Sequence, residues 1–193
     1  GIKEVILLTG YRGEQIREYF KEGSQSGLLI RYSHGPVEWE TGRRLFEAKE
    51  LLDEHFLLLY SDNFLSFNLE KIVKFYNEQK KILSFIVQPK EKGNIRMGEG
   101  VAVQIYDKTR SAEGLSFVEL GYMLVSKRVF EFYSHKDVSF SDIISKLVLA
   151  GQVAGFIALD VYHSISDLQR LKLTQEYLKP KKILLIDRDG VIN

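Results

Sequence analysis

The sequence predicts an α/β protein with a three-layer, Rossmann-like core built on a mixed, mainly parallel sheet. Over the first half of the chain, apolar runs of strand-forming residues alternate with helical patterns, which is typical of βα units. From about Gly98 the runs at residues 101–106 and 117–125 follow each other with no helical pattern between them, which indicates a mixed or antiparallel region. The length of 193 residues allows one or two domains with a sizeable core.

Each strand is expected from an apolar run that a turn signal ends. The first run, at residues 5–8, has no polar interruption, which is typical of a strand buried on both faces. The third run ends at Ser61-Asp62-Asn63 and therefore carries a carboxylate at its tip. In chain order, the expected strands span residues 5–8, 28–32, 56–60, 83–87, 101–106, 117–125 and 154–161.

The helices are expected from apolar side chains three or four residues apart and from capping residues. Asn68 is expected to cap one helix, with Glu70 and Lys74 paired on its surface. Ser139 or Ser141 is expected to cap a later one. Six helices are expected in chain order. The first carries Ile16, Tyr19 and Phe20 on one side, the second spans 41–52, and the third runs from Asn68 to about Lys80. The fourth lies near 127–133, the fifth near 141–150, and the last runs from Ser166 or Asp167 to Leu178.

Composition narrows the class of protein. The hydrophobic fraction of 45% and the charged fraction of 27% are those of a soluble globular protein. A net charge of +1 gives no electrostatic reason to expect nucleic acid or an anionic membrane as a partner. Cysteine is absent, which excludes disulfides and thiolate metal sites. The longest apolar stretch, residues 147–161, is too short to cross a bilayer, and no signal peptide precedes the first strand, so we expect a cytoplasmic protein.

The last residues form a motif with defined chemistry. Asp187 and Asp189 follow the apolar run 183–186, so that two carboxylates stand at the tip of a strand, where open α/β sheets bind ligands. The pair suits a nucleophilic Asp, a second Asp for acid–base work and a bound Mg²⁺. The sequence DRDGVIN resembles the opening motif of haloacid-dehalogenase-type phosphatases, in the form of the heptose-bisphosphate and histidinol-phosphate branch. We expect residues 180–193 to be the start of a truncated phosphatase domain, idle in this chain.

Four earlier segments share their order and spacing with the motifs of one enzyme family. They are GYRGEQI at 10–16, ETGRRL at 40–45, LLLYSD at 57–62, and YHSISD at 162–167 with Leu171 after it. Together they resemble the sugar-phosphate nucleotidyltransferases. The resemblance implies a nucleotidyltransferase-like domain at residues 1–179. Such a domain would join an NTP to a sugar 1-phosphate, a hexose or heptose, and release pyrophosphate.

The resemblance also implies roles for individual residues. Thr41 and Gly42 would bind the nucleotide, because a residue without Cβ lets a ligand approach the backbone. Asp62 would hold Mg²⁺ and contact the nucleotide, since a cation neutralises phosphate charge during transfer. Two alternatives stay open. Asp62 is also suited to cap the next segment, and Gly42 to start a helix.

The chain departs from the family's motifs at several points. The Gly-rich loop GGxGTRL, which cradles the triphosphate through backbone N–H groups, would precede residue 1 and is missing from the sequence given. The position of the second metal-binding Asp falls on Ser164, and a hydroxyl is a poorer Mg²⁺ ligand than a carboxylate. A shifted register would use Asp160 or Asp167 instead.

The sugar site is expected near Glu119 and Gly121, which stand where the family has Asn-Ala-Gly. For Gly121, close approach of two backbone segments is an equal alternative. Lys108 corresponds to a phosphate-contacting Lys of the family, although an exposed turn lysine is the simpler interpretation.

Two functions remain open at this stage. The first is nucleotidyl transfer in a bifunctional protein that also carries a sugar-phosphate phosphatase. This function would serve activated heptose synthesis for a cell-surface glycan. The second is a catalytically inactive domain for binding or assembly, which the missing loop and Ser164 favour. A homo-oligomer is compatible with either, because a cut chain exposes a sheet edge.

Overall fold

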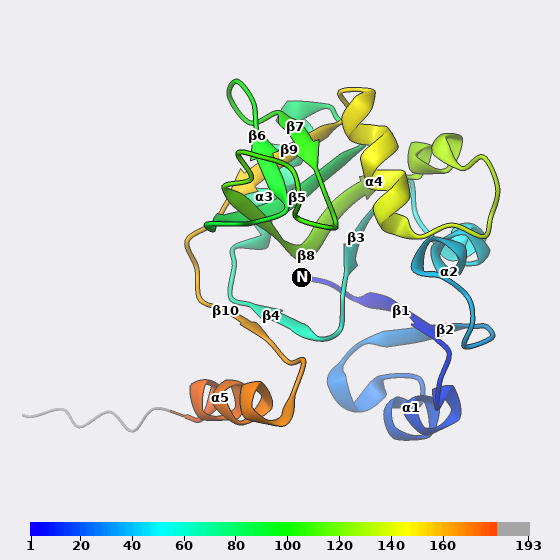
Figure 1. Ribbon diagram of the computed structural model, residues 1–193. Coiled ribbons are helices and arrows are strands. Elements are labelled where there is room, and N and C mark those ends of the chain that lie inside the picture. The colour runs from blue at the N-terminus through cyan, green and yellow to red at the C-terminus, as the bar shows by residue number, and fades with distance from the viewer. Residues whose placement is uncertain (181–193) are drawn as a thin grey trace, which may run out of the picture.

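The computed structural model describes residues 1–180 (Figure 1), so the expected phosphatase pair Asp187 and Asp189 lies outside the described residues. The strands are β1 Glu4–Thr9, β2 Leu29–His34, β3 His55–Leu59, β4 Asn63–Leu65, β5 Leu83–Pro89, β6 Ile95–Met97, β7 Val103–Tyr106, β8 Phe117–Ser126, β9 Val153–Ile157 and β10 Tyr162–Ser164. The α-helices are α1 Gly13–Phe20, α2 Thr41–Glu47, α3 Leu69–Gln79, α4 Phe140–Leu149 and α5 Leu168–Leu178. Short 3₁₀ helices span Ser24–Ser26, Lys49–Leu51 and Lys127–Phe132.

The largest sheet is mixed and mostly antiparallel. Its strand order is β7-β6-β8-β5-β9, and β3 also pairs with β8. The pair β5–β9 is parallel, whereas β8 runs antiparallel to β3, β5 and β6. The prediction of a mainly parallel sheet was therefore wrong. The reason is that β8, which comes late in the chain, lies between β3 and β5 and opposes both.

Two smaller sheets lie beside the large one. Strands β1 and β2 pair in parallel, and β4 pairs with β10 in antiparallel register. The second pair joins residues about a hundred positions apart in the sequence, with Asn63 opposite Ser164. This pairing brings the turn after β3 next to the segment that leads into α5.

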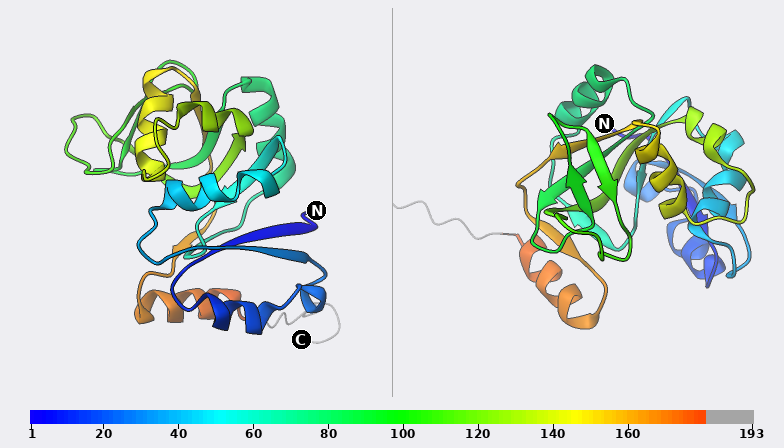
Figure 2. Two further views of the ribbon diagram at one scale, coloured as in Figure 1. Left: turned by 90° about the vertical axis from the view of Figure 1, so that its right-hand side faces the viewer. Right: turned by 45° about the horizontal axis from the view of Figure 1, so that its top comes forward.

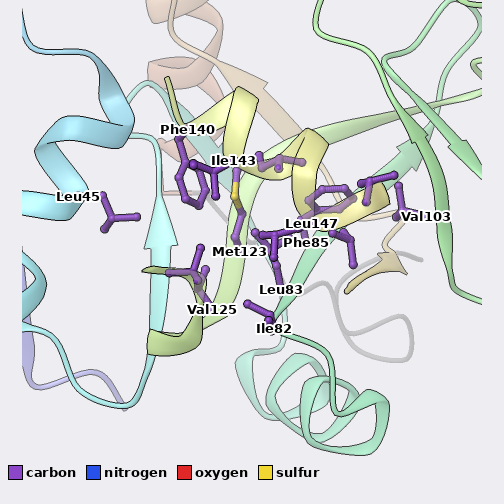
Figure 3. Packing of buried hydrophobic residues seen from close by; sticks show 14 of the residues in the cluster. Leu45, Ile82, Leu83, Phe85, Val103, Met123, Val125, Phe140, Ile143 and Leu147 are labelled. Atoms are coloured by element: carbon purple, nitrogen blue, oxygen red, sulfur yellow. The ribbon is translucent and has the colours of Figure 1, made fainter. Parts of the chain in front are cut away.

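Helices cover both faces of the large sheet, so the expected three-layer arrangement is present. The left view of Figure 2 shows α4 and α3 on either side of the strands. Along β5, Phe85 faces one core and Ile86 the other, because successive strand residues point to opposite faces. Phe85 packs with Met123 and with Leu147 of α4 (Figure 3). Both faces of the central strands are therefore buried.

Capping residues resolve the alternatives left by the sequence. Asn68 accepts a hydrogen bond from the Lys71 amide at 3.0 Å, as predicted. Ser139, rather than Ser141, caps α4, and Asp167, rather than Ser166, caps α5.

Several predicted boundaries were wrong. The expected helix 41–52 is divided at Ala48 into α2 and a 3₁₀ turn, and the strand expected at 154–161 ends at Ile157. Lys74 lies 3.9 Å from Glu78 rather than pairing with Glu70. The three-residue strands β4, β6 and β10 had no sequence signal, because three residues are too few to show alternation.

Candidate active site

Asp62 lies in the turn between β3 and β4, and its side chain is exposed. The backbone carbonyl of Asp62 accepts a hydrogen bond from the amide of Ile165 at 2.6 Å. Because Asn63 pairs with Ser164 across β4 and β10, this bond extends the same ladder. The structure therefore brings Asp62 and Ser164, the two predicted metal ligands, to the same edge.

Asn63 holds this turn in place. Its side-chain oxygen accepts a hydrogen bond from the Tyr162 hydroxyl at 2.7 Å, and its carbonyl accepts one from the Tyr122 hydroxyl at 2.8 Å. The Tyr122 hydroxyl also accepts from the Leu65 amide at 3.1 Å. No motif in the sequence marks Asn63 as a site residue, and its position directly after Asp62 is the one available signal. These bonds hold the backbone of the turn that carries Asp62.

Gly121 packs directly against the same turn. Its φ of +76° lies in the left-handed region, and its carbonyl accepts a hydrogen bond from the Tyr60 amide at 3.0 Å. A Cβ at this position would overlap the amide nitrogen of Asn63 and lie 3.0 Å from a ring carbon of Tyr60. Close approach between protein segments thus explains this glycine.

Glu119 completes the group on β8. Its carboxylate accepts a hydrogen bond from the Gly121 amide at 2.7 Å. Burial raises the pKa of Glu119 above its ordinary value, and the nearby Asp62 carboxylate contributes in the same direction, whereas Arg110 opposes it. Glu119 and Gly121 therefore lie beside the turn that carries Asp62, and Ser164 lies across from that turn on β10. The predicted roles of these residues toward metal and sugar stay predictions.

Thr41 and Gly42 lie at a second place, the start of α2. The Thr41 hydroxyl accepts a hydrogen bond from the Phe140 amide at 3.0 Å, and the Gly42 carbonyl accepts one from the Tyr133 hydroxyl at 3.1 Å. A Cβ on Gly42 would overlap the carbonyl of Val138. The glycine is thus required for packing of α2 against the segment before α4. Its predicted contact with nucleotide stays a prediction.

Tyr60 connects the two places. Burial raises its pKa, with further contributions from Glu119 and Asp62. Burial also raises the pKa of Tyr133, with a contribution from Tyr60. The raised pKa keeps the Tyr60 hydroxyl protonated at neutral pH.

Lys108 is held by an acidic partner. Its ammonium donates a hydrogen bond to Asp142 at 2.9 Å, which raises the pKa of Lys108 and lowers that of Asp142. The Ser139 hydroxyl donates to the other Asp142 oxygen at 2.7 Å. Lys108 is thus an exposed turn lysine, as the simpler interpretation expected, and it is paired with Asp142.

The residues present can be tested against a bound magnesium ion. Among residues 1–180, no group of three or more His, Asp or Glu side chains is placed to hold a metal. Mg²⁺ is often held by one or two carboxylates together with substrate phosphates, and the exposed Asp62 suits that arrangement. The Ser164 hydroxyl already accepts a hydrogen bond from Arg170 at 2.6 Å. The site therefore fits a metal that Asp62 and a phosphate ligand share.

No helix in the described part is long and apolar enough to cross a membrane.

The family described as nucleotidyl transferase matches residues 1–162, so the chain belongs to this family. It is 28% identical over 203 residues to a probable glucose-1-phosphate cytidylyltransferase of Bacillus subtilis (strain 168). The alignment covers 89% of this chain and 78% of that protein. It is 28% identical over 150 residues to a D-glycero-alpha-D-manno-heptose 1-phosphate guanylyltransferase of Campylobacter jejuni, covering 76% and 66%. It spans 38% of the bifunctional protein GlmU of Methanococcus maripaludis, at 24% identity.

Solved structures share the fold. HddC from Yersinia pseudotuberculosis superposes with a TM-score of 0.78 at 17% identity, covering 93% of this chain and 80% of that one. A UTP-bound UGPase from Acinetobacter baumannii gives a TM-score of 0.68 at 14% identity, covering 92% and 77%. The chain thus has the α/β nucleotidyltransferase fold.

Proposed function

We propose that this chain transfers a nucleotidyl group from an NTP to the phosphate of a hexose or heptose 1-phosphate, giving an NDP-sugar and pyrophosphate. Family membership supports the reaction class, and the names of the cytidylyl- and guanylyltransferase relatives support a sugar 1-phosphate as acceptor. The observation that carries the proposal is the exposed Asp62 carboxylate, which a hydrogen-bonded turn presents beside Glu119 and Ser164.

In this reaction, an oxygen of the sugar phosphate attacks the α-phosphorus of the NTP. A new P–O bond forms, the bond from that phosphorus to the β-phosphate oxygen breaks, and pyrophosphate leaves with the electron pair. A bound Mg²⁺ would neutralise charge on the phosphates and fix their geometry, and Asp62 would hold it. Asn63 and Tyr162 keep the Asp62 turn in place during the reaction.

The remaining predicted residues have roles that we assign by position. Glu119 and Gly121 would face the sugar, whose hydroxyl groups can donate hydrogen bonds to the Glu119 carboxylate. Thr41 and Gly42 would lie near the nucleotide at the start of α2. Ser164 stands at the position of the second metal-binding Asp, and we assign it to the edge where Asp62 would hold the metal.

We also propose that this domain, residues 1–179, is one part of a larger cytoplasmic protein. Within the described chain, β1 pairs with β2 and β3 with β8, which leaves one edge of β1 and one of β3 free. These edges support a further strand, and with it a phosphate-binding loop, ahead of residue 1. The motif at Asp187 and Asp189 supports a phosphatase beginning at residue 180, and the heptose preference rests on that motif. The glycan product class rests on the same motif.

A second candidate is a nucleotidyltransferase-like domain without catalysis, which binds a sugar nucleotide or assembles with other subunits. The observation that favours it is Ser164, where a carboxylate is expected and where a hydroxyl instead accepts a bond from Arg170. This candidate predicts ligand binding without turnover.

A substrate panel separates the two candidates. The chain would be incubated with Mg²⁺, each common NTP and a set of hexose and heptose 1-phosphates, and the products analysed by mass spectrometry. An NDP-sugar peak is expected for one pair and names both substrates. Absence of product for every pair, also with upstream sequence restored, would leave the binding domain as the better account.

A further inference from the structure

Arg170 reaches the edge of the candidate site from α5. It is the third residue of that helix, and its guanidinium donates a hydrogen bond to the Ser164 hydroxyl at 2.6 Å. Ser164 lies opposite Asn63, the residue after Asp62. The structure therefore places a permanent positive charge where the resemblance expected a second carboxylate.

Two contacts orient this side chain. Asp167 accepts a hydrogen bond from the Arg170 amide at 2.8 Å, and its carboxylate lies 3.5 Å from the Arg170 guanidinium. The Arg170 side chain nevertheless remains 55% exposed. A guanidinium has five N–H donors in a planar fork, so donors remain for a ligand when Arg170 is bonded to Ser164 and paired with Asp167.

The helix that carries Arg170 is docked by a cluster of rings. His163 of β10 lies with its ring centroid 4.7 Å from that of Tyr177 of α5, and Phe64 of β4 lies 5.9 Å from Tyr177. These contacts join the last turns of α5 to the β4–β10 pair. The first turn is held by the hydrogen bond from Arg170 to Ser164, so α5 is fixed at both ends relative to the β4–β10 pair.

The electrostatics of Tyr162 agree with this placement. Burial raises its pKa, the Asp62 and Glu119 carboxylates raise it further, and Arg170 lowers it. Asp62 and Arg170 thus shift the pKa of the same hydroxyl in opposite directions, because their charges are opposite.

We propose that Arg170 binds a phosphate group of the substrates at the Asp62 edge, and that Ser164 positions it. The proposal rests on the proposed function, which supplies two phosphate-bearing ligands, the NTP and the sugar 1-phosphate. Arg–phosphate pairs are charge-assisted and often bidentate, which suits a guanidinium with free donors. A second carboxylate would neutralise phosphate charge indirectly, by helping to hold a metal. Arg170 would neutralise it directly, by contact with the phosphate.

Ligand binding measured without metal tests the proposal. In EDTA, isothermal titration would give the affinity of the wild-type chain and of Arg170→Gln for each common NTP and for glucose 1-phosphate. We expect roughly 10- to 100-fold weaker binding of one ligand, and the ligand affected identifies which phosphate Arg170 contacts. Ser164→Ala should weaken the same ligand by a smaller factor, and Arg170→Lys should restore part of the loss.

Arg128→Gln is the matched control. Arg128 lies 3.5 Å from Glu131 three residues along the chain and its side chain is 60% exposed, so it resembles Arg170 in ion pairing and exposure. The control should bind both ligands like the wild type. Equal affinities of Arg170→Gln and wild type for both ligands would overturn the proposal.

Turnover distinguishes this proposal from the function on which it rests. If the wild type forms NDP-sugar while Arg170→Gln shows an unchanged KM for both substrates, the phosphate contact is refuted and the transferase stands. If the wild type forms no product but Arg170→Gln still loses affinity, the contact stands and the transferase fails. Binding of neither ligand by the wild type, both in EDTA and with Mg²⁺ present, would overturn both.

Discussion

Substitution of Gly121 by Ala tests how the candidate site is packed. The φ of +76° costs an Ala about 1–2 kcal/mol, of which about 0.4–1 kcal/mol is returned by the stiffer unfolded chain. The new Cβ also displaces the Asn63 amide and breaks its 2.7 Å bond with Tyr162, at a cost of about 1–3 kcal/mol. We therefore expect a loss of about 2–4 kcal/mol in the free energy of unfolding.

Gly151 provides the matched control. Its φ is +66°, and a Cβ there would have no atom within 4 Å. Gly151→Ala should therefore cost only about 0.5–1 kcal/mol, from the backbone alone. Urea unfolding followed by circular dichroism measures both variants, provided that their m values agree with the wild type.

The contact with Asn63 can be isolated further. Asn63→Ala in the Gly121→Ala background should cost less than Asn63→Ala alone, because the crowded side chain is already displaced. Equal losses for Gly121→Ala and Gly151→Ala would refute the packing of Gly121 against the Asp62 turn.

Two further predictions concern the core and the response to pH. Leu147→Ala, at a fully buried position of α4, should lower the free energy of unfolding in urea by about 2–5 kcal/mol. Leu149→Ala, at 89% exposure on the same helix, should change it by no more than about 0.5 kcal/mol. Similar losses for the two variants would contradict the core assignment. Burial raises the pKa of Tyr76 to about 12, and its hydroxyl bonds His55 at 2.9 Å. Because the unfolded chain ionises first, this stabilisation is complete below about pH 10 and is lost as the pH rises to about 12. Tyr76→Phe should show a shallower fall in unfolding free energy over that window, and an unchanged slope would contradict the burial.

The sequence predicted the features that local physics determines. Asn68 was identified as a cap because its side chain satisfies a nearby amide, and the strand at 83–87 because every residue in it is apolar or small. The sheet direction could not be predicted, since it depends on β8 lying between two strands that come much earlier. That pairing has no local pattern.

The candidate site divides in the same way. Asp62 and Ser164 were selected from motif order, and their proximity follows from the pairing of β4 with β10. Arg170 was missed because its position depends on the docking of α5 through rings on three different elements. For Gly42 the sequence left a nucleotide contact and a helix start open; the structure shows the backbone of Val138 against this residue, and the nucleotide contact stays a prediction. Glycine alone does not reveal what approaches it.

If Asp62 holds the metal during nucleotidyl transfer, removing its charge should slow the reaction. Pyrophosphate release would be measured with Mg²⁺ and the substrate pair that the panel selects, for the wild type, for Asp62→Asn and for Asp53→Asn. Asp53 is an exposed acidic residue in the loop before β3, whereas Asp62 follows that strand, so Asp53 serves as the control. We expect Asp62→Asn to slow release by at least roughly a hundredfold and Asp53→Asn to leave it unchanged. Equal rates for all three proteins would contradict the account.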